Sequence, residues 1–584
     1  MNSSPLRAAT ESPIEAGPLV LAFAIALVSA LALLPASARA QVDWAIDLEL
    51  EGSGEPLPTA LLGHYDLSGQ LLAYDQQAGL VEAMTAVGFS EWRVGVGRWE
   101  ASTWLLPSLT DGTPCFTPIP GSAAPPGWGD LDLIAARDWF SDDGAPVTLA
   151  DTQDDARYAL DYLRAVLDVV DAFGATPFVS IDSMPRALAV NETPLRTDCQ
   201  WSFQNRVTNV RPEYASVFGA AVAGLVQRIV EGSHGQPARG VTHWEIWNEP
   251  EFAPFWDKSF EDGAGELDRY FEMAVGALFA LDAYRSGSAH PNAQQLAFGL
   301  GSFGTAPVAV ATLAGFDAAA VPGGFVPIDF LSFHAYSDDP LEVVAAIDQV
   351  ASAAAATTHY AEIELALAEW GPNLTGSAGD PVYAASIEPG LHVATVLSLG
   401  ANAGLDRAHR AIFWDFFPDS IRLGLLDHDR NPRSAYRAYE LLSRTIVEGA
   451  ERLTPTGLAD GRLDGGLGAL LASRDAGGVV RVLFTNRNAE ARTARVRLGG
   501  AARIPSRMLV YDDPSAAIAE VPGSASEVVV PAASLVLLEF DPAPVPAANG
   551  PGRGVLGVLL GAVGLGVLRG RARSQARARS QDVV

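Results

Sequence analysis

Two glutamates stand at the ends of short apolar runs, and a proline closes each run. Residues 241–251 stop at Asn248-Glu249-Pro250, and residues 365–372, with the sequence LALAEWGP, carry Glu369. Because proline cannot donate a hydrogen bond to a sheet ladder, both runs are predicted to be strands that end there and leave the glutamates at their carboxyl ends. Two carboxyl groups in such positions form a candidate acid/base pair.

The elements that would position these glutamates follow a repeating pattern of strand and helix. Apolar runs alternate with stretches of helical periodicity from about residue 60 to about residue 450. Alternation of this kind is typical of a parallel sheet, and eight units in about 390 residues predict an α/β fold, a closed (β/α)8 TIM barrel with insertions. The predicted strands are residues 60–64, 91–96, 177–182, the run that starts at 241, 296–302, 328–334, 364–369 and 411–415.

In this count Glu249 ends the fourth strand and Glu369 ends the seventh, so both carboxyl groups are expected at one mouth of the barrel. Cleavage of a glycosidic bond requires such a pair. One carboxyl group gives a proton to the leaving oxygen, while the other stays ionised to attack or to activate water. Asn248 adds an amide that can hydrogen-bond a sugar hydroxyl near the reaction centre.

The motif Trp247-Asn248-Glu249-Pro250 with a later strand-end glutamate resembles the clan of retaining barrel glycosidases. Three further segments resemble glycoside hydrolase family 39, the β-xylosidase and α-L-iduronidase family: residues 177–188 (PFVSIDSMPRAL), 329–336 (DFLSFHAY) and 424–436 (GLLDHDRNPRSAY). The resemblance spans about residues 60–450. It implies a retaining glycoside hydrolase that acts by double displacement on β-xyloside-like or related oligo- or polysaccharides, without a cofactor.

By this resemblance Glu249 would be the general acid/base and Glu369 the nucleophile. Asn248 would bind the hydroxyl next to the anomeric carbon. Four further residues are predicted to bind substrate, the last of them by stacking on a sugar face: Arg93, His334, Tyr336 and Trp414.

Other interpretations of these residues stay open at this point. Either glutamate could be a structural ion-pair member, His334 and Tyr336 could form a hydrogen-bonded core pair, and Trp414 could be an ordinary packed aromatic. Glu245 is expected to be an ion-pair member inside the barrel and a partner of Arg93. The nine histidines are scattered and the two cysteines are not clustered, so no metal site is predicted.

The sequence departs from the family pattern at two places. The His-Gly pair expected soon after the second-strand arginine is replaced by Val94-Gly95-Val96-Gly97, and Ile181-Asp182-Ser183 precedes the Met-Pro of the third strand. Both departures leave the sugar and the linkage open. Residues 97–151 form a long insertion that could wall off a pocket, giving exo action, or line a cleft, giving endo action. An endo-acting exopolysaccharide hydrolase of the same clan and a catalytically silent surface glycan-binding protein are the alternatives.

Composition excludes several classes of protein. An apolar content of 48% excludes a mainly disordered chain, and the formal charge of -30, from 39 Lys+Arg against 69 Asp+Glu, argues against binding to nucleic acid. Six arginines fall in the last 41 residues beside one aspartate, so the rest of the chain is more acidic still. A solvated acidic surface is the simplest interpretation, and the oligomeric state is left open.

Residues 1–40 are predicted to be a signal peptide, because an apolar stretch from 17 to 34 precedes Ala38-Arg39-Ala40, which has the small-x-small form of a signal-peptidase site. The protein is therefore expected to be exported to the periplasm, the cell surface or the medium. A buried helix or a retained anchor is the alternative. In an exported protein Cys115 and Cys199 could form a disulfide or remain two buried thiols.

Residues 544–584 resemble the C-terminal sorting tails of bacterial proteins, which consist of a short motif, a hydrophobic helix and an arginine cluster. The apolar run 554–568 is short for a span of about 20 residues, but the arginines that follow it from Arg569 fit a cytoplasmic flank. No Pro-Glu-Pro motif is present. A membrane anchor and a processed sorting signal, read by sorting machinery, are both open.

Four regions follow from these patterns: the signal peptide at 1–40, the catalytic barrel at 41–452, an all-β sandwich at 453–543 and the tail at 544–584. The sandwich is predicted from six short β-rich runs separated by Gly, Pro and Asp. Residues 42–50 alternate apolar and acidic side chains and are expected to form a strand that could complete the sandwich.

Overall fold

The computed structural model describes residues 42–50, 54–66, 71, 79–96, 139–141, 146–182, 184–189, 214–252, 255–256, 267–319, 325–374, 376–415 and 422–542. The predicted signal peptide, both cysteines, most of the 97–151 insertion and the predicted C-terminal tail lie outside these residues. The chain divides into a compact unit, Met1–Asp541, and a second unit, Pro542–Val584. The architecture below belongs to the first unit.

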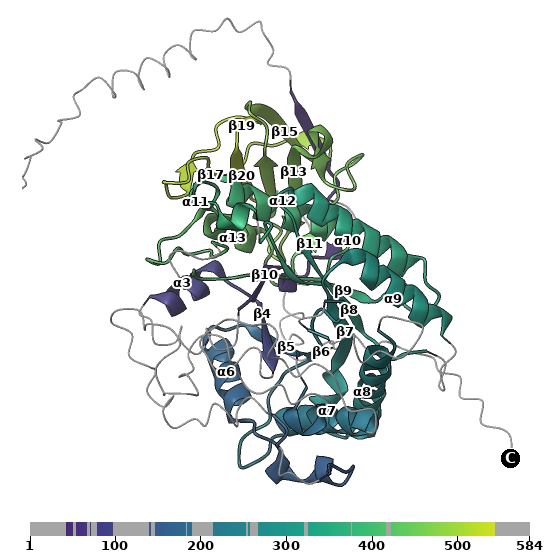
Figure 1. Ribbon diagram of the computed structural model, residues 1–584. Coiled ribbons are helices and arrows are strands. Elements are labelled where there is room, and N and C mark those ends of the chain that lie inside the picture. The colour runs from purple at the N-terminus through teal and green to yellow at the C-terminus, as the bar shows by residue number, and fades with distance from the viewer. Residues whose placement is uncertain are drawn as a thin grey trace, which may run out of the picture. The chain divides into compact units, whose positions relative to one another are not determined.

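Eight parallel strands close into a barrel in the order β10-β3-β4-β5-β6-β7-β8-β9 (Figure 1). The pairing of β10 with β3, which places His409 beside Gly63, closes the ring. The predicted (β/α)8 fold is confirmed. The strands are β3 (Gly63–Tyr65), β4 (Glu91–Val96), β5 (Thr176–Ile181), β6 (His243–Ile246), β7 (Ala297–Phe303), β8 (Phe330–Tyr336), β9 (Glu364–Gly371) and β10 (Arg407–Ala411).

Helices connect the strands and cover the barrel. In α6 the buried residues Val166, Leu167 and Val170 fall on one side, whereas α12 is buried along nearly its whole length. Prolines occupy the first turns of α11 and α12, where the missing N–H costs no helical hydrogen bond. The helices are α3 (Leu80–Val87), α6 (Asp161–Ala172), α7 (Ala215–Val230), α8 (Asp268–Gly287), α9 (Ala306–Ala318), α10 (Pro340–Ala355), α11 (Pro381–Ala384), α12 (Glu388–Asn402) and α13 (Ser434–Thr445).

Two predicted strands differ from the structure. Residues 60–62, taken as part of the first strand, lie in a 3-10 helix, Thr59–Leu62, whose Leu61 and Leu62 are buried, and β3 begins only at Gly63. The eighth strand was predicted at 411–415 but runs over Arg407–Ala411. Because Arg407 and His409 are polar, a search for apolar runs does not detect this strand.

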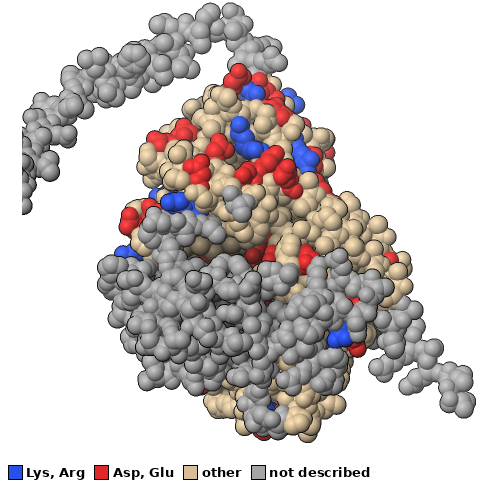
Figure 2. Space-filling model, viewed as in Figure 1, with Lys and Arg blue, Asp and Glu red and all other residues tan. Residues whose placement is uncertain are grey.

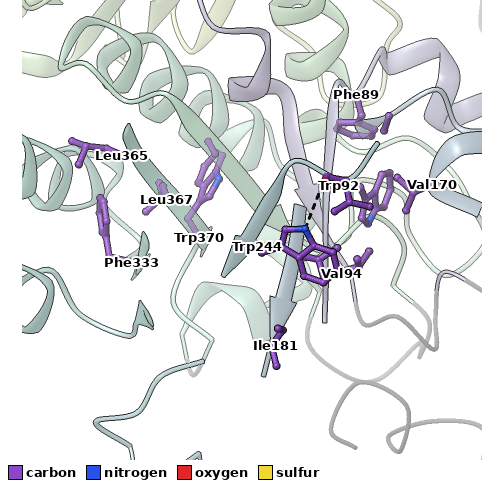
Figure 3. Close-up of a cluster of buried hydrophobic side chains, with 14 of the residues drawn as sticks. Phe89, Trp92, Val94, Val170, Ile181, Trp244, Phe333, Leu365, Leu367 and Trp370 are labelled. Atoms are coloured by element: carbon purple, nitrogen blue, oxygen red, sulfur yellow. Dashed lines mark hydrogen bonds between the residues drawn. The ribbon is translucent and has the colours of Figure 1, made fainter. Parts of the chain in front are cut away.

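Neighbouring residues on the strands alternate between the layer under the helices and the barrel interior. Figure 3 shows Trp92 of β4, Trp244 of β6 and Trp370 of β9 within a cluster of buried apolar side chains. Side chains of a strand point to opposite faces in turn, so the residues next to these tryptophans point inward. Those inward residues are polar: Arg93, Glu245 and Glu369.

Two β-sheets, built mainly from residues after the barrel, share one apolar core, in which Trp44 stacks on Phe484 with ring centroids 5.8 Å apart. β1 (Trp44–Leu48) pairs in parallel with β15 (Arg492–Leu498), so this early strand lies in the same sheet. β15 also pairs with β16 (Ala501–Ala502) and β19 (Glu527–Val530).

The second sheet has the order β18-β17-β20-β14-β13-β11-β2, with β12 beside β13. Its strands are β2 (Glu55–Pro56), β11 (Glu451–Arg452), β12 (Arg462–Leu463), β13 (Gly468–Arg474), β14 (Val480–Asn486), β17 (Arg507–Tyr511), β18 (Ala519–Val521) and β20 (Ser534–Phe540).

The central strand of the larger sheet, β14, is buried on both faces. Val482 and Phe484 of β14 face the core between the two sheets, whereas Leu483 between them joins the core of the barrel. Burial on both sides explains why this strand reads as a nearly continuous apolar run rather than an alternating one. The larger sheet therefore packs directly on the barrel unit.

Acidic and basic side chains are interspersed on the face of these sheets seen in Figure 2. Several are paired, as Arg507 is with Glu520 at 2.7 Å and Arg481 with Glu539 at 3.3 Å. Within the described residues no helix combines the length and the apolar character needed to cross a membrane.

Candidate active site

The chain leaves β6 through a tight turn that presents Asn248 and Glu249. Trp247 and Glu249 both have left-handed backbone, with φ of 77° and 44°. Non-glycine residues adopt this conformation only where their surroundings fix it. Here the Trp247 N–H donates to the Ile181 carbonyl at 2.8 Å, and the Glu249 N–H donates to the Ser302 carbonyl at 3.0 Å. The turn after β6 is thus held by the strands on either side of it.

Arg93 is the hub of the barrel interior. Its Nε and Nη2 donate to Glu245 Oε2 at 3.0 and 2.7 Å, and its Nη1 donates to Glu369 Oε1 at 2.8 Å. Nη2 also donates to Asn248 Oδ1 at 3.0 Å. Burial lowers the pKa of Arg93, but the charges of Glu245 and Glu369 outweigh burial and raise it overall. The predicted pairing of Glu245 with Arg93 is confirmed.

His334 lies between the two strand-end glutamates. Its Nδ1 is 2.8 Å from Glu249 Oε1, and its Nε2 is 3.8 Å from Glu369 Oε1. Burial lowers the pKa of His334, but the charges of Glu369 and Glu249 more than compensate, so the pKa lies above its ordinary value. One imidazole ring therefore contacts both carboxylates.

Glu369 is held from two sides. Tyr336 donates its hydroxyl proton to Oε2 at 3.0 Å, while Arg93 donates to Oε1. Burial, and then the charge of Glu369, raise the pKa of Tyr336 well above its ordinary value, so its phenol stays a donor. With a different donor on each oxygen, the carboxylate of Glu369 has one preferred orientation.

A bulge sets this geometry. In the pairing of β8 with β9, Phe333 lies beside Leu367, whereas the next residue, His334, lies beside Glu369. Ala368 is therefore an extra residue, and the shift turns His334 and Glu369 to the same place. Without it, a regular register would put His334 beside Ala368.

Trp414 is placed differently from the other predicted site residues. Its indole Nε1 donates to the His428 carbonyl at 3.1 Å, its ring stacks on the His428 ring, and it is 2% exposed. Its predicted stacking on a sugar stays a prediction. The residues that the structure brings together are Arg93, Asn248, Glu249, His334, Tyr336 and Glu369.

Several residues of the site were not singled out from the sequence. Ser302 accepts a hydrogen bond from Arg93 Nη2 at 2.8 Å, Ser180 accepts one at 3.3 Å, and the guanidinium lies over the Tyr65 ring at 4.9 Å. Their signal is modest: each is a polar or aromatic residue at the end of an apolar run. Glu251, two residues beyond Glu249, was also missed.

Residues 128–390 match the family model described as glycosyl hydrolases family 39. This segment of the chain is therefore similar to glycoside hydrolase family 39. The matched segment contains both strand-end glutamates, Asn248, His334 and Tyr336. The sequence matches no curated protein.

Solved structures share the fold of this chain. A monomeric beta-xylosidase from Caulobacter crescentus CB15 is 16% identical, covers 86% of this chain and 100% of its own, and has a TM-score of 0.55. The family 39 enzyme from Xanthomonas axonopodis pv. citri is 17% identical, with 88% and 100% coverage and a TM-score of 0.54. An alpha-L-arabinofuranosidase from Thermotoga maritima is 15% identical, with 85% and 99% coverage and a TM-score of 0.50. The chain is a glycoside hydrolase with a carbohydrate substrate.

Proposed function

We propose that the enzyme cleaves β-xyloside-like or related glycans with retention of configuration, by double displacement. The observation that carries this proposal is the contact of both strand-end carboxylates with the one buried ring of His334. Two carboxyl groups on either side of one small space suit an acid and a nucleophile that must reach the same glycosidic bond. The beta-xylosidase and the alpha-L-arabinofuranosidase of the same fold support the sugar class.

The reaction takes two steps. In the first, Glu369 attacks the anomeric carbon while Glu249 gives its proton to the glycosidic oxygen, so the bond to the leaving group breaks and a glycosyl ester forms on Glu369. In the second, Glu249 takes a proton from water, the water oxygen attacks the anomeric carbon, and the ester bond breaks. Two inversions at one carbon give net retention.

The neighbours of the glutamates have distinct tasks in this scheme. Arg93 and Tyr336 orient the nucleophile by donating to opposite oxygens of Glu369. The Oδ1 of Asn248 is occupied by Arg93, so its amide nitrogen is the group left to donate to a sugar hydroxyl. His334 fixes the carboxyl group of Glu249 through a single hydrogen bond.

Alanine variants of the two glutamates test the scheme on activated aryl glycosides. We expect Glu369→Ala to lose turnover, because no ester can form. We expect Glu249→Ala to lose about 10²–10⁴-fold, the usual contribution of general acid/base catalysis. Azide should restore turnover in Glu249→Ala and yield a glycosyl azide of retained configuration. Unchanged activity in Glu369→Ala would reject the mechanism.

Two further measurements separate the alternatives. Product analysis on a series of xylo-oligosaccharides distinguishes exo from endo action. Absence of activity on a broad panel of glycosides, together with measurable glycan binding, would favour a surface glycan-binding protein instead. An inverted product would point to carboxyl groups separated by more than about 5.5 Å.

We also propose that the enzyme is exported and held at the cell surface by residues 544–584. The apolar stretch before Ala38-Arg39-Ala40 supports cleavage after Ala40, and the arginines that follow the run 554–568 support a cytoplasmic flank. N-terminal sequencing of the protein recovered from membrane, periplasm and medium should find Gln41 first. A chain that ends at Pro542 should move from the membrane to the soluble fraction, and an unchanged distribution would reject the tail as an anchor.

A further inference from the structure

An exposed aromatic side chain follows the proposed acid/base in the chain. Phe252 stands three residues after Glu249 and is 41% exposed. It is the most exposed phenylalanine, tyrosine or tryptophan in the described part of the chain. Because apolar surface gains free energy when it leaves water, this ring can bind a ligand that covers it.

The backbone around Phe252 is fixed. Its N–H donates to the Glu249 carbonyl at 3.0 Å, and its own carbonyl accepts from the Trp256 N–H at 3.1 Å. Trp256 is fully buried, and its ring lies edge-to-face against that of Trp247 with centroids 5.5 Å apart. Trp247 directly precedes Asn248 and Glu249 in the chain. One anchored segment therefore carries both the proposed acid/base and the exposed ring.

Gly304 makes room for the ring of Phe252. A Cβ atom at Gly304 would lie 2.2 Å from Cε2 of Phe252, far inside van der Waals contact. The backbone of Gly304 is not left-handed, so the close approach of the ring, and not the conformation, calls for glycine here. Since the Glu249 N–H donates to the Ser302 carbonyl, the end of β7 supports Glu249 and Phe252 together.

The chemistry on this side of the site differs from that around the proposed nucleophile. Glu369 is surrounded by groups that donate hydrogen bonds, Arg93 and Tyr336. A general acid gives its proton to the glycosidic oxygen, so the leaving group must lie next to Glu249. One face of a pyranose ring presents C–H groups, which suit the negatively polarised face of an aromatic ring.

We propose that Phe252 is a specificity-determining residue that stacks on the leaving-group sugar, so that the enzyme favours glycans over glycosides of small alcohols. This inference rests on the proposed function, because it takes Glu249 as the acid/base. In the first step the bond between the anomeric carbon and the glycosidic oxygen breaks, and the sugar bound on Phe252 leaves with the proton of Glu249. Water then takes the place of that sugar for the second step.

Discrimination between leaving groups tests this role. The test compares kcat/KM for xylobiose, which has a leaving-group sugar, with kcat/KM for β-xylosyl fluoride, whose fluoride ion offers no ring to stack. In Phe252→Ala the ratio of the two values should fall by about 10- to 100-fold, as expected when one large apolar side chain no longer covers its ligand. An unchanged ratio, including an equal loss on both substrates, would overturn the proposal. If the glycoside panel identifies another sugar, its disaccharide and its fluoride replace these two probes.

Three further variants separate stacking from other effects. Phe252→Tyr keeps the aromatic face and should stay close to the wild-type ratio. Gly304→Ala should lower the ratio, because its added methyl group must displace the ring. Ile504→Ala is the matched control and should leave the ratio unchanged, since Ile504 is 58% exposed but lies between two strands of the β-sheet domain. A ratio that falls as far in Phe252→Tyr as in Phe252→Ala would overturn the stacking.

Binding to an inactive parent provides a readout that needs no turnover. In Glu369→Ala, calorimetric titration should show that adding Phe252→Ala weakens the binding of xylobiose by about 10-fold or more, and that of xylose less. Equal weakening of both would overturn the proposal. If Glu369→Ala itself keeps full activity, the proposed function fails. If Glu369→Ala is inactive and its affinity for xylobiose does not depend on Phe252, only this inference fails.

Discussion

The Nδ1 of His334 lies 2.8 Å from Glu249 Oε1, and its Nε2 lies 3.8 Å from Glu369 Oε1. One ring nitrogen lies within hydrogen-bond distance of the carboxyl group proposed to give a proton, and the other lies within ion-pair distance of the one proposed to attack. One residue on β8 thereby lies between an acid in the turn after β6 and an acid on β9. The charge on His334 depends on both of them.

His334→Gln is expected to reduce the stability of the enzyme in a pH-dependent way. The folded pKa of His334 lies above its ordinary value, so its stabilising contribution is fully present below the unfolded value of about 6.5 and is lost as pH rises through the folded pKa. The difference in melting temperature between wild type and variant should be largest at pH 5.5 and smaller at pH 9. A difference that grows with pH would show that His334 is not charged between the two glutamates.

Tyr336→Phe should lower kcat by about 10- to 100-fold, because the phenol donates a hydrogen bond to a charged carboxylate, an interaction of about 1.5–3 kcal/mol. The melting temperature should change little, since the ring is kept. Tyr360→Phe is the control: its hydroxyl is also buried and donates to the Val326 carbonyl at 3.0 Å. Equal kcat values in the two variants would show that the Tyr336 hydroxyl does not contribute to turnover.

Arg93→Met should destabilise the fold as well as abolish turnover. Removing one partner of a buried ion pair costs about 3–5 kcal/mol, because the other charge stays buried without a partner. Here Glu245 would keep none of the two hydrogen bonds that it accepts from Arg93. In urea unfolding, Arg93→Met with Glu245→Gln should be more stable than Arg93→Met alone. If the stability losses of Arg93→Met and Glu245→Gln simply add in the double variant, this coupling is contradicted.

The opposite end of the barrel holds a second ionic network. Arg407 pairs with Glu91 and with Glu364, the latter at 3.2 Å; His409 Nε2 lies 2.8 Å from Glu91, and His243 Nε2 lies 3.4 Å from Glu364. These polar residues stand at the start of strands β4, β6, β9 and on β10. They lie away from the carboxyl ends at which the candidate site is built.

Glu364→Gln is expected to lower the stability of the enzyme near neutral pH but to have little effect on stability in acid. Burial raises the pKa of Glu364, but His243 and Arg407 lower it further, to about 2. Its stabilising contribution is present above the unfolded value of about 4.3 and is lost as pH falls through the folded value. The unfolding midpoints of wild type and Glu364→Gln should converge between pH 5 and pH 2.5, whereas Glu362→Gln should match wild type throughout. A gap that persists at pH 2.5 would contradict the ion pair.

The sequence predicted those strands of the fold whose buried side chains form a run of apolar residues. Six barrel strands were found at or near their predicted positions because their side chains pack under the helices, as Trp92 and Trp244 do. β10 was misplaced because Arg407 and His409 are satisfied by Glu91, which is 316 and 318 residues distant, respectively. A local pattern cannot reveal a partner at that separation.

The candidate site followed from the sequence only in its outline. Strand-end positions predicted that Glu249 and Glu369 face one mouth, and the alternation of a strand predicted the Arg93–Glu245 pair. The bulge that places His334 beside Glu369 leaves no pattern, since one extra residue in β9 alters no composition.

The pairing of β1 with β15 joins a segment that is synthesised early to one that is synthesised late. The Thr493 N–H donates to the Asp43 carboxylate across 450 residues, so the sheet that contains Trp44 cannot form until almost all of the chain is available. Contacts between such distant residues slow folding, because a long loop must close first. If the chain is exported from its N-terminus, β1 crosses the membrane early and can pair only after β15, near the other end of the chain, has also crossed.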